Sequence, residues 1–319
     1  MKDTLDFTSL PVSALDFMDW PWERIEPYYV ELIAGCSRIF HRMDPQLGTY
    51  FDTLVLDVEP RPNKYPGDGF TLMYAVTRQS FILLNPTGCN QDVIGLIHEA
   101  GHAFYALETA HLDFLQIGGA GLGEFPAQTM ELLALPYLSA DEGGFYTPTD
   151  AARAYIDQLE WILGFFCSVG RAEAFRQWAY THPKEAVDPA QYSTQWRACE
   201  ARFFPAVDWR DLETECAVSW QNSFALFFPP FAFLGAAISQ LGALRVWRNA
   251  QHDPAYAIAN WRKALSLDAQ GSSRQATYAA CGAEYTLEPA ALADAIAHLE
   301  TQIAQLENEY EHSFPEEDL

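Results

Sequence analysis

The segment that most constrains this chain is residues 98–102, which read His-Glu-Ala-Gly-His within the run VIGLIHEAGHAFYALETA. An α-helix completes one turn in 3.6 residues, so His98 and His102 project from the same face of a helix. Two imidazoles placed in this way can bind one tetrahedral metal ion. Glu99 lies about 100° around the helix from His98. It is therefore a candidate general base for a metal-bound water, without being a ligand itself.

The residues around the motif help to distinguish a metal site from an ordinary core helix that happens to contain two histidines. The residues before His98 are densely apolar (Val93, Ile94, Leu96 and Ile97), which predicts a buried helix. Burying two histidines and a glutamate is costly unless they pair with one another or bind a metal. The sequence therefore favours a metal site.

A catalytic zinc ion keeps three protein ligands and one open position, so a third ligand has to come from elsewhere in the chain. The best candidate is Glu124, which begins a helical pattern after the glycine-rich residues 118–123. The alternative for Glu124 is an acid at a helix N-terminus, stabilised by the helix dipole. Glu131 lies two turns further along the same face and is suited to accept a histidine N–H. Zinc is the expected ion, and manganese, cobalt and iron also suit two histidines and a carboxylate.

The composition excludes several kinds of partner. The net charge is −24, from 19 Lys+Arg against 43 Asp+Glu, and such a surface repels phosphate backbones and anionic lipids. We therefore expect neither nucleic acid nor a membrane as a partner.

Six scattered cysteines without a CxxC pair, and an N-terminus without an apolar signal core, indicate a cytoplasmic protein. Residues 224–244 are strongly apolar, but Pro229, Pro230 and Gln240 favour a buried helix over a membrane span.

Helical periodicity dominates the chain, which has room for one or two domains. Two short β-like runs, residues 70–75 and 80–84, predict a small hairpin, and strand is expected only within residues 50–85. Besides the helix around residues 98–102, we expect helices at residues 13–44, 125–138, 149–182, 190–204, 208–228, 231–251, 253–266 and 289–311.

Several segments in series resemble the M3 family of zinc oligopeptidases, in particular the oligoendopeptidase F type. LDVEPRPNKYPGDGF is similar to the loop that precedes the substrate-edge strand in that family. DVIGLIHEAGHAFYALE is similar to the metal helix, and EFPAQTMELLALPYL to the helix that bears the third ligand. WAYTHP and PPFAFLGAAISQLGALRVWRNA resemble the C-terminal helices. The resemblance covers nearly the whole chain. It implies a mainly α, zincin-like catalytic domain over residues 1–319, with a small sheet beside the metal helix.

Carried over position by position, the resemblance implies that His98, His102 and Glu124 bind zinc. Glu99 would be the general base, and Glu131 would hold a ligand histidine in place.

One departure from the family concerns the N-terminus, because family members usually carry a further helical region that roofs the active-site channel. Only 97 residues precede the motif here. We therefore expect no such roof domain, and a cleft that is open or covered by a second copy or another subunit.

The second departure concerns the chemistry. In the family, the segment that matches residues 220–247 bears a histidine and two tyrosines, which donate hydrogen bonds to the scissile carbonyl and its oxyanion. The matching positions here are Ala225, Phe233 and Ala236, whose side chains donate no hydrogen bond. Loss of one oxyanion donor typically costs about 10²–10³ in rate. Other donors would have to replace them, and the candidates are Tyr74, Tyr105 and Tyr256.

These observations leave three hypotheses open. The first is a zinc metallopeptidase that cleaves short peptides, with the strand at residues 70–75 pairing with the substrate. The second is a repurposed zinc enzyme that keeps the metal and Glu99 but acts on a small molecule, for example in a biosynthetic pathway. The third is a subordinate subunit of an M3-like heteromer. The intact metal motif counts against the third hypothesis, and the absent donors count against the first.

Overall fold

A computed structural model describes residues 22–61, 64, 69–74, 76–110, 112, 122–227 and 229–311. The chain divides into two compact units, residues 1–157 with 239–319 (unit 1) and residues 158–238 (unit 2). That both units form one catalytic domain over residues 1–319 stays a prediction. No helix among the described residues combines the length and the apolar character needed to cross a membrane.

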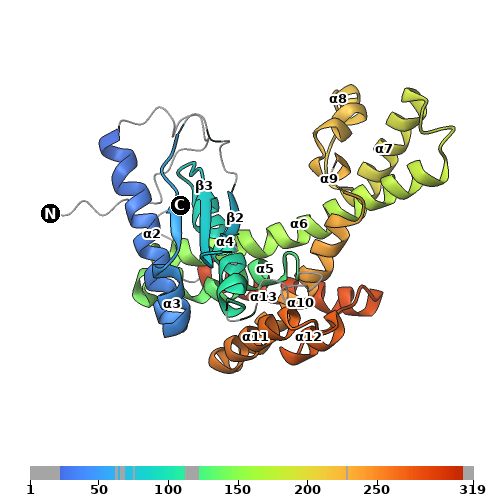
Figure 1. Cartoon of the computed structure of the whole chain (residues 1–319). Coiled ribbons are helices and arrows are strands. Elements are labelled where there is room, and N and C mark those ends of the chain that lie inside the picture. Colours follow the sequence, from blue (N-terminus) through green and yellow to red (C-terminus); the bar gives the residue numbers. More distant parts are fainter. Residues whose placement is uncertain are drawn as a thin grey trace. The chain divides into compact units, whose positions relative to one another are not determined.

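The fold is mainly helical with one small sheet, so the predicted fold class is confirmed (Figure 1). Unit 1 contains α2 (Trp22–Met43), α3 (Pro45–Asp52), β1 (Val55–Asp57), β2 (Gly69–Tyr74), β3 (Gln79–Leu84), α4 (Asn90–Glu108), α5 (Phe125–Ala134), η3 (Leu135–Tyr137), η4 (Ala140–Glu142), α11 (Pro254–Ala269), α12 (Arg274–Ala280) and α13 (Pro289–Glu311). Unit 2 contains α7 (Pro189–Phe203), α8 (Glu213–Val218), η5 (Ser219–Asn222) and α9 (Phe224–Phe227), while α6 (Pro148–Thr181) and α10 (Ala232–Ala250) each belong partly to both units.

The single helix predicted over residues 208–228 is wrong, because α8, η5 and α9 divide this segment. The hydroxyl of Ser219 donates to the carbonyl of Cys216 at 3.0 Å and accepts the indole N–H of Trp196 at 2.7 Å. Serine hydroxyls that bond to nearby backbone compete with the helical pattern. The start of the helix predicted at residues 13–44 lies partly outside the described residues, which begin at Trp22.

The sheet has the order β1-β3-β2, with β1 parallel and β2 antiparallel to β3. The predicted hairpin is therefore confirmed as β2 and β3, and β1 adds a short third strand. On one face of the hairpin, Gly69 is paired with Leu84, Thr71 with Ile82, and Met73 with Ser80. The three β3 residues are buried, and both strands contact α4. Among the described strands, β2 pairs only with β3, so its other edge is available for pairing.

Helix α4 is fixed at its N-terminal end by Asp92, a buried carboxylate. This side chain accepts hydrogen bonds from the backbone N–H groups of Thr87, Gly88 and Cys89 and from the hydroxyl of Tyr28. These bonds hold the segment that leads into the helix and satisfy the N–H of its N-cap residue, Cys89. Asp92 thus anchors the start of the helix that carries both histidines.

Gly101 determines how closely α5 approaches α4. A Cβ atom at this position would lie 2.6 Å from the Cα of Ala127 and 2.7 Å from the carbonyl oxygen of Pro126. Such contacts are far inside normal packing distance, so only glycine permits the observed spacing. Because Gly101 lies between His98 and His102, this close packing brings the start of α5 next to both imidazoles.

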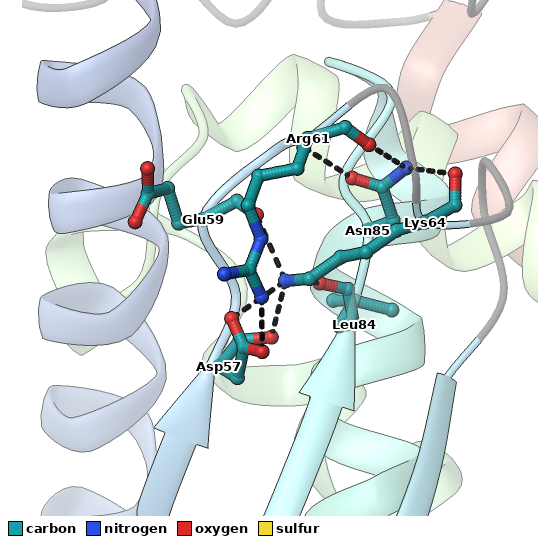
Figure 2. A network of polar contacts seen from close by, with 6 residues as sticks. All are labelled: Asp57, Glu59, Arg61, Lys64, Leu84 and Asn85. Carbon is teal, nitrogen blue, oxygen red and sulfur yellow. Dashed lines mark hydrogen bonds and ion pairs between the residues drawn. The ribbon is translucent and has the colours of Figure 1, made fainter.

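A network around Lys64 joins β1, β3 and the segment that precedes β2 (Figure 2). The side chain of Lys64 is only 5% exposed, and its Nζ donates to Asp57 Oδ1 at 2.7 Å and to the carbonyl of Glu59 at 2.8 Å. Asn85 is fully buried and binds the backbone of both Arg61 and Lys64. The network therefore holds the chain in place where it leaves β1 and β3.

Candidate metal centre

Helices α4 and α5 bring the side chains of His98, His102 and Glu124 together. The two imidazole rings lie on one face of α4 with their centroids 5.1 Å apart. Glu124 is the residue immediately before α5, and its Oε2 lies 3.2 Å from Nε2 of His98 and 3.5 Å from Nε2 of His102. The potential ligand atoms of all three residues lie within 4.8 Å of one another.

The three side chains fit a divalent transition metal. Ligand bonds to zinc are about 2.0–2.2 Å, so two atoms on a tetrahedral ion lie about 3.3–3.5 Å apart. The distances from Glu124 to the two imidazoles match this spacing, and two imidazoles with a carboxylate are a common donor set for catalytic zinc. In the part of the chain that the structure describes, no other group of three such residues has this geometry.

Glu131 lies behind His98 and sets its orientation. Its Oε1 is 2.5 Å from Nδ1 of His98, and the carboxylate is almost fully buried. With Nδ1 engaged by Glu131, Nε2 is the nitrogen that faces Glu124 and His102. Carboxylates that hold a ligand histidine in this way fix the ring and make it a stronger ligand.

The electrostatics of the cluster favour positive charge where the three side chains meet. Burial lowers the pKa of His98, but its hydrogen bonds and charge interactions with Glu124 and Glu131 outweigh burial and raise it to about 10. The hydrogen bonds from His102 and His98 hold the pKa of Glu124 well below its usual range. A bound proton or a metal ion would supply this positive charge, and the two compete for the same nitrogen atoms.

Glu99 lies next to the cluster and is only 8% exposed. Its Oε2 accepts a hydrogen bond from the Thr71 hydroxyl at 2.7 Å, and its backbone carbonyl lies 2.8 Å from the same hydroxyl. Gly69 lies against the same side chain, since a Cβ built there would be 3.2 Å from Glu99 Oε1. The sequence did not single out Thr71 or Gly69, because only the register of β2 reveals that they face α4.

The cluster opens into a pocket of about 610 Å³ in unit 1. Gly69, Phe70, Thr71 and Met73 of the edge strand β2 line it, as do residues 122–124 and 126 immediately before and at the start of α5. His98, Glu99, His102 and Glu124 all line it. An extended ligand that paired with β2 would therefore pass beside the candidate metal ligands.

Of the three tyrosines considered as replacement donors, Tyr105 lines the pocket. Its hydroxyl donates to Oδ2 of Asp268 at 2.8 Å, so its proton already has an acceptor. Burial, followed by the interactions with Asp268, raises the pKa of Tyr105 above the ordinary value for tyrosine. Tyr74 and Tyr256 are 51% and 66% exposed and are not among the residues that line the pocket.

Ala225, Phe233 and Ala236 all lie in unit 2, in or beside α9 and the first part of α10. The backbone carbonyl of Ala225 accepts a hydrogen bond from Arg176, which is buried within the same unit. Phe233 and Ala236 are half-buried. Their predicted relation to the substrate stays a prediction.

No family model and no curated protein matches the chain. Solved structures with similar folds include "PZ peptidase A with inhibitor 2", with a TM-score of 0.75 at 19% identity over 86% of this chain and 48% of that one. A second is a putative oligoendopeptidase F, with a TM-score of 0.73 at 23% identity over 85% of this chain and 48% of that one. A third is a putative oligoendopeptidase F from Bacillus anthracis str. Ames, with a TM-score of 0.67 at 18% identity over 86% of this chain and 46% of that one. The chain thus has the fold of these peptidases and spans about half the length of their structures.

Proposed function

We propose that this protein is a zinc-dependent hydrolase of the M3 type, which cleaves a short peptide or a peptide-like small molecule. The observation that carries the proposal is the convergence of His98, His102 and Glu124 at one end of a pocket, with buried Glu99 beside them. The fold shared with solved peptidases supports the same class of reaction. Because the identities are only 18–23%, the similarity concerns the fold, and the proposed reaction is argued from the residues of the site.

His98, His102 and Glu124 would hold the ion, and Glu131 would keep His98 in its binding orientation. When bound, zinc would supply Lewis-acid polarisation of a carbonyl and a water of lowered pKa. Glu99 would accept the proton of the attacking water and pass it to the leaving amine. An extended peptide would pair with the open edge of β2, which places its backbone along the pocket wall.

A second candidate, altered non-peptidase chemistry on a small molecule, is favoured by the apolar side chains at positions 225, 233 and 236, where the resemblance implies a histidine and two tyrosines, and by the engaged hydroxyl of Tyr105. Both observations reduce the number of donors that could stabilise a peptide oxyanion. The proposed partner is accordingly a short peptide or a small molecule, and a second copy or another subunit could cover the pocket.

The test is a panel of fluorogenic peptides and small amide or ester substrates with zinc-loaded protein. Glu99→Gln should lower kcat by about 10²–10⁴, because a general base contributes about this factor, while zinc stays bound. Glu300→Gln, an exposed change on α13, is the matched control and should leave kcat unchanged. Cleavage that is unaffected by Glu99→Gln would contradict the proposal. Turnover of small substrates without peptides would favour the second candidate.

A further inference from the structure

Strand β2 contributes more to the site than a pocket wall, because two of its residues contact the side chain of Glu99. Thr71 and Gly69 are two residues apart and therefore face the same side of the strand, towards α4. The Thr71 hydroxyl lies 2.7 Å from Glu99 Oε2, and a Cβ on Gly69 would lie 3.2 Å from Oε1. One residue therefore holds one carboxylate oxygen, and the other allows the second oxygen to pack against the strand.

The Thr71 hydroxyl has one proton and two nearby acceptors, which are Glu99 Oε2 and the Glu99 backbone carbonyl at 2.8 Å. Both acceptors belong to the same residue, so the contact fixes the side chain of Glu99 relative to its own backbone as well as to β2. Glu99 is 8% exposed, so little solvent is available to replace the Thr71 hydroxyl as the partner of Oε2. A hydrogen bond to a charged group is among the stronger ones in proteins.

We propose that Thr71 is a positioning residue, which holds Glu99 in the conformation that a general base needs. This inference rests on the proposed function. Thr71 binds Oε2 and leaves Oε1 to receive the proton of the reacting water. Because β2 is also the strand along which an extended ligand would lie, Thr71 ties the base to the strand that places the substrate.

A purely structural role for Thr71 would be to join the sheet to α4, and it predicts a different pattern. In that case Thr71→Val would lower stability and the amount of folded protein, and the folded fraction would keep its kcat. A positioning role predicts a lower kcat per folded, zinc-loaded molecule, with KM changed by less than about threefold. Loss of a hydrogen bond to a charged group corresponds to a decrease of about 10- to 100-fold.

The experiment compares zinc-loaded wild type with Thr71→Val, Thr71→Ser and Thr71→Ala. Thr77→Val, an exposed change in the turn between β2 and β3, is the matched control. We expect Thr71→Val and Thr71→Ala to lower kcat as stated, and Thr71→Ser, which keeps the hydroxyl, to stay within about threefold of wild type. Zinc content should be the same in all of them. If Thr71→Val does not fold, Thr71→Ala provides the same comparison without a second methyl group.

Crystal structures of the same zinc-loaded proteins give a readout that needs no turnover. Glu99 should keep its position in wild type and Thr71→Ser, and its carboxylate should shift or adopt several conformers in Thr71→Val and Thr71→Ala. An unmoved Glu99, or an unchanged kcat, in both of these variants would overturn the inference. If wild type cleaves no substrate, the proposed function fails, while the position of Glu99 still decides whether Thr71 holds it.

Discussion

Unit 1 contains two polar clusters near the same small sheet, one around Lys64 and one around His98, and they differ in how their groups are paired. In the Lys64 network of Figure 2, the lysine is 5% exposed and donates to the Asp57 carboxylate and to backbone carbonyls, while the buried Nε of Arg61 has no partner. In the His98 cluster, two imidazole nitrogens and a carboxylate oxygen converge on one point beside a pocket. In the first cluster the charges of Lys64 and Asp57 neutralise each other, and the second cluster has the geometry of one that binds a cation.

The two clusters differ in the kind and spacing of their groups: Lys64 donates to carboxylate and carbonyl oxygens, whereas two imidazoles and a carboxylate meet at His98 with the spacing of metal ligands. Buried charges are tolerated when each is paired and hydrogen-bonded, as at Lys64. Near His98, the neighbouring carboxylates raise the pKa of the imidazole and so favour a positive charge there, and the depressed pKa of Glu124 means that its carboxylate stays ionised as the counter-charge. The Lys64 network should therefore govern stability, and the His98 cluster should govern metal binding.

The largest effect on stability is expected for Lys64→Met. This change leaves the Asp57 carboxylate and several backbone carbonyls without the donor that they share. Asp57 keeps 27% of its side chain exposed, so the expected cost is that of leaving partly buried acceptors without their donor, about 1–3 kcal/mol of unfolding free energy. Urea unfolding of the variant and of wild type measures the difference.

Lys263→Met is the control for that prediction, because Lys263 is exposed on α11 and its replacement should change the unfolding free energy by less than about 0.5 kcal/mol. Folded Lys64→Met protein should still take up zinc. The assignment of stability to the Lys64 network and of metal binding to the His98 cluster would be wrong in either of two cases. Lys64→Met could have the same unfolding free energy as the control, or it could stay stable but lose the metal.

A smaller effect is expected for Glu131→Gln, which weakens the contact to Nδ1 of His98 without removing a ligand. Replacing such a carboxylate typically costs about 10- to 100-fold in metal affinity. Competition with a chromogenic chelator measures the zinc dissociation constant, and Glu26→Gln on the exposed side of α2 is the control. An affinity equal to that of wild type would mean that Glu131 does not support the ligand.

The smallest effect concerns pH and Asp57. Burial raises the pKa of Asp57, but Lys64 and Arg61 lower it by more, so the folded value lies below the usual one. Its ionised form therefore stabilises the fold above the unfolded pKa of about 3.9, and this contribution is lost as the pH falls through the folded value. The stability difference between wild type and Asp57→Asn, about 1 kcal/mol or less, should shrink from pH 7 to pH 3. A difference that grows on acidification would contradict this assignment.

Local periodicity accounts for the parts of the structure that the sequence predicted. The helical repeat alone places His98 and His102 on one face, and alternation with turn residues gave the hairpin of β2 and β3. Local periodicity did not predict that residues 208–228 form three short helices rather than one, because the Ser219 hydroxyl interacts there with the backbone and with Trp196.

Contacts between distant segments account for what the sequence could not give. The Thr71–Glu99 and Tyr105–Asp268 hydrogen bonds join residues that are 28 and 163 positions apart. Each depends on strand register or on helix packing, and neither leaves a pattern in the local sequence. The same holds for Gly101, whose missing side chain matters only because α5 packs against it.

The most direct test of the central claim is the metal content of the pure protein after exposure to zinc and dialysis, measured by elemental analysis. We predict one zinc ion per chain for wild type and for His252→Gln, a change of an exposed histidine outside the cluster. His102→Gln should fold and hold far less than one ion. Wild type without bound metal, or His102→Gln with the same zinc content as wild type, would contradict the account.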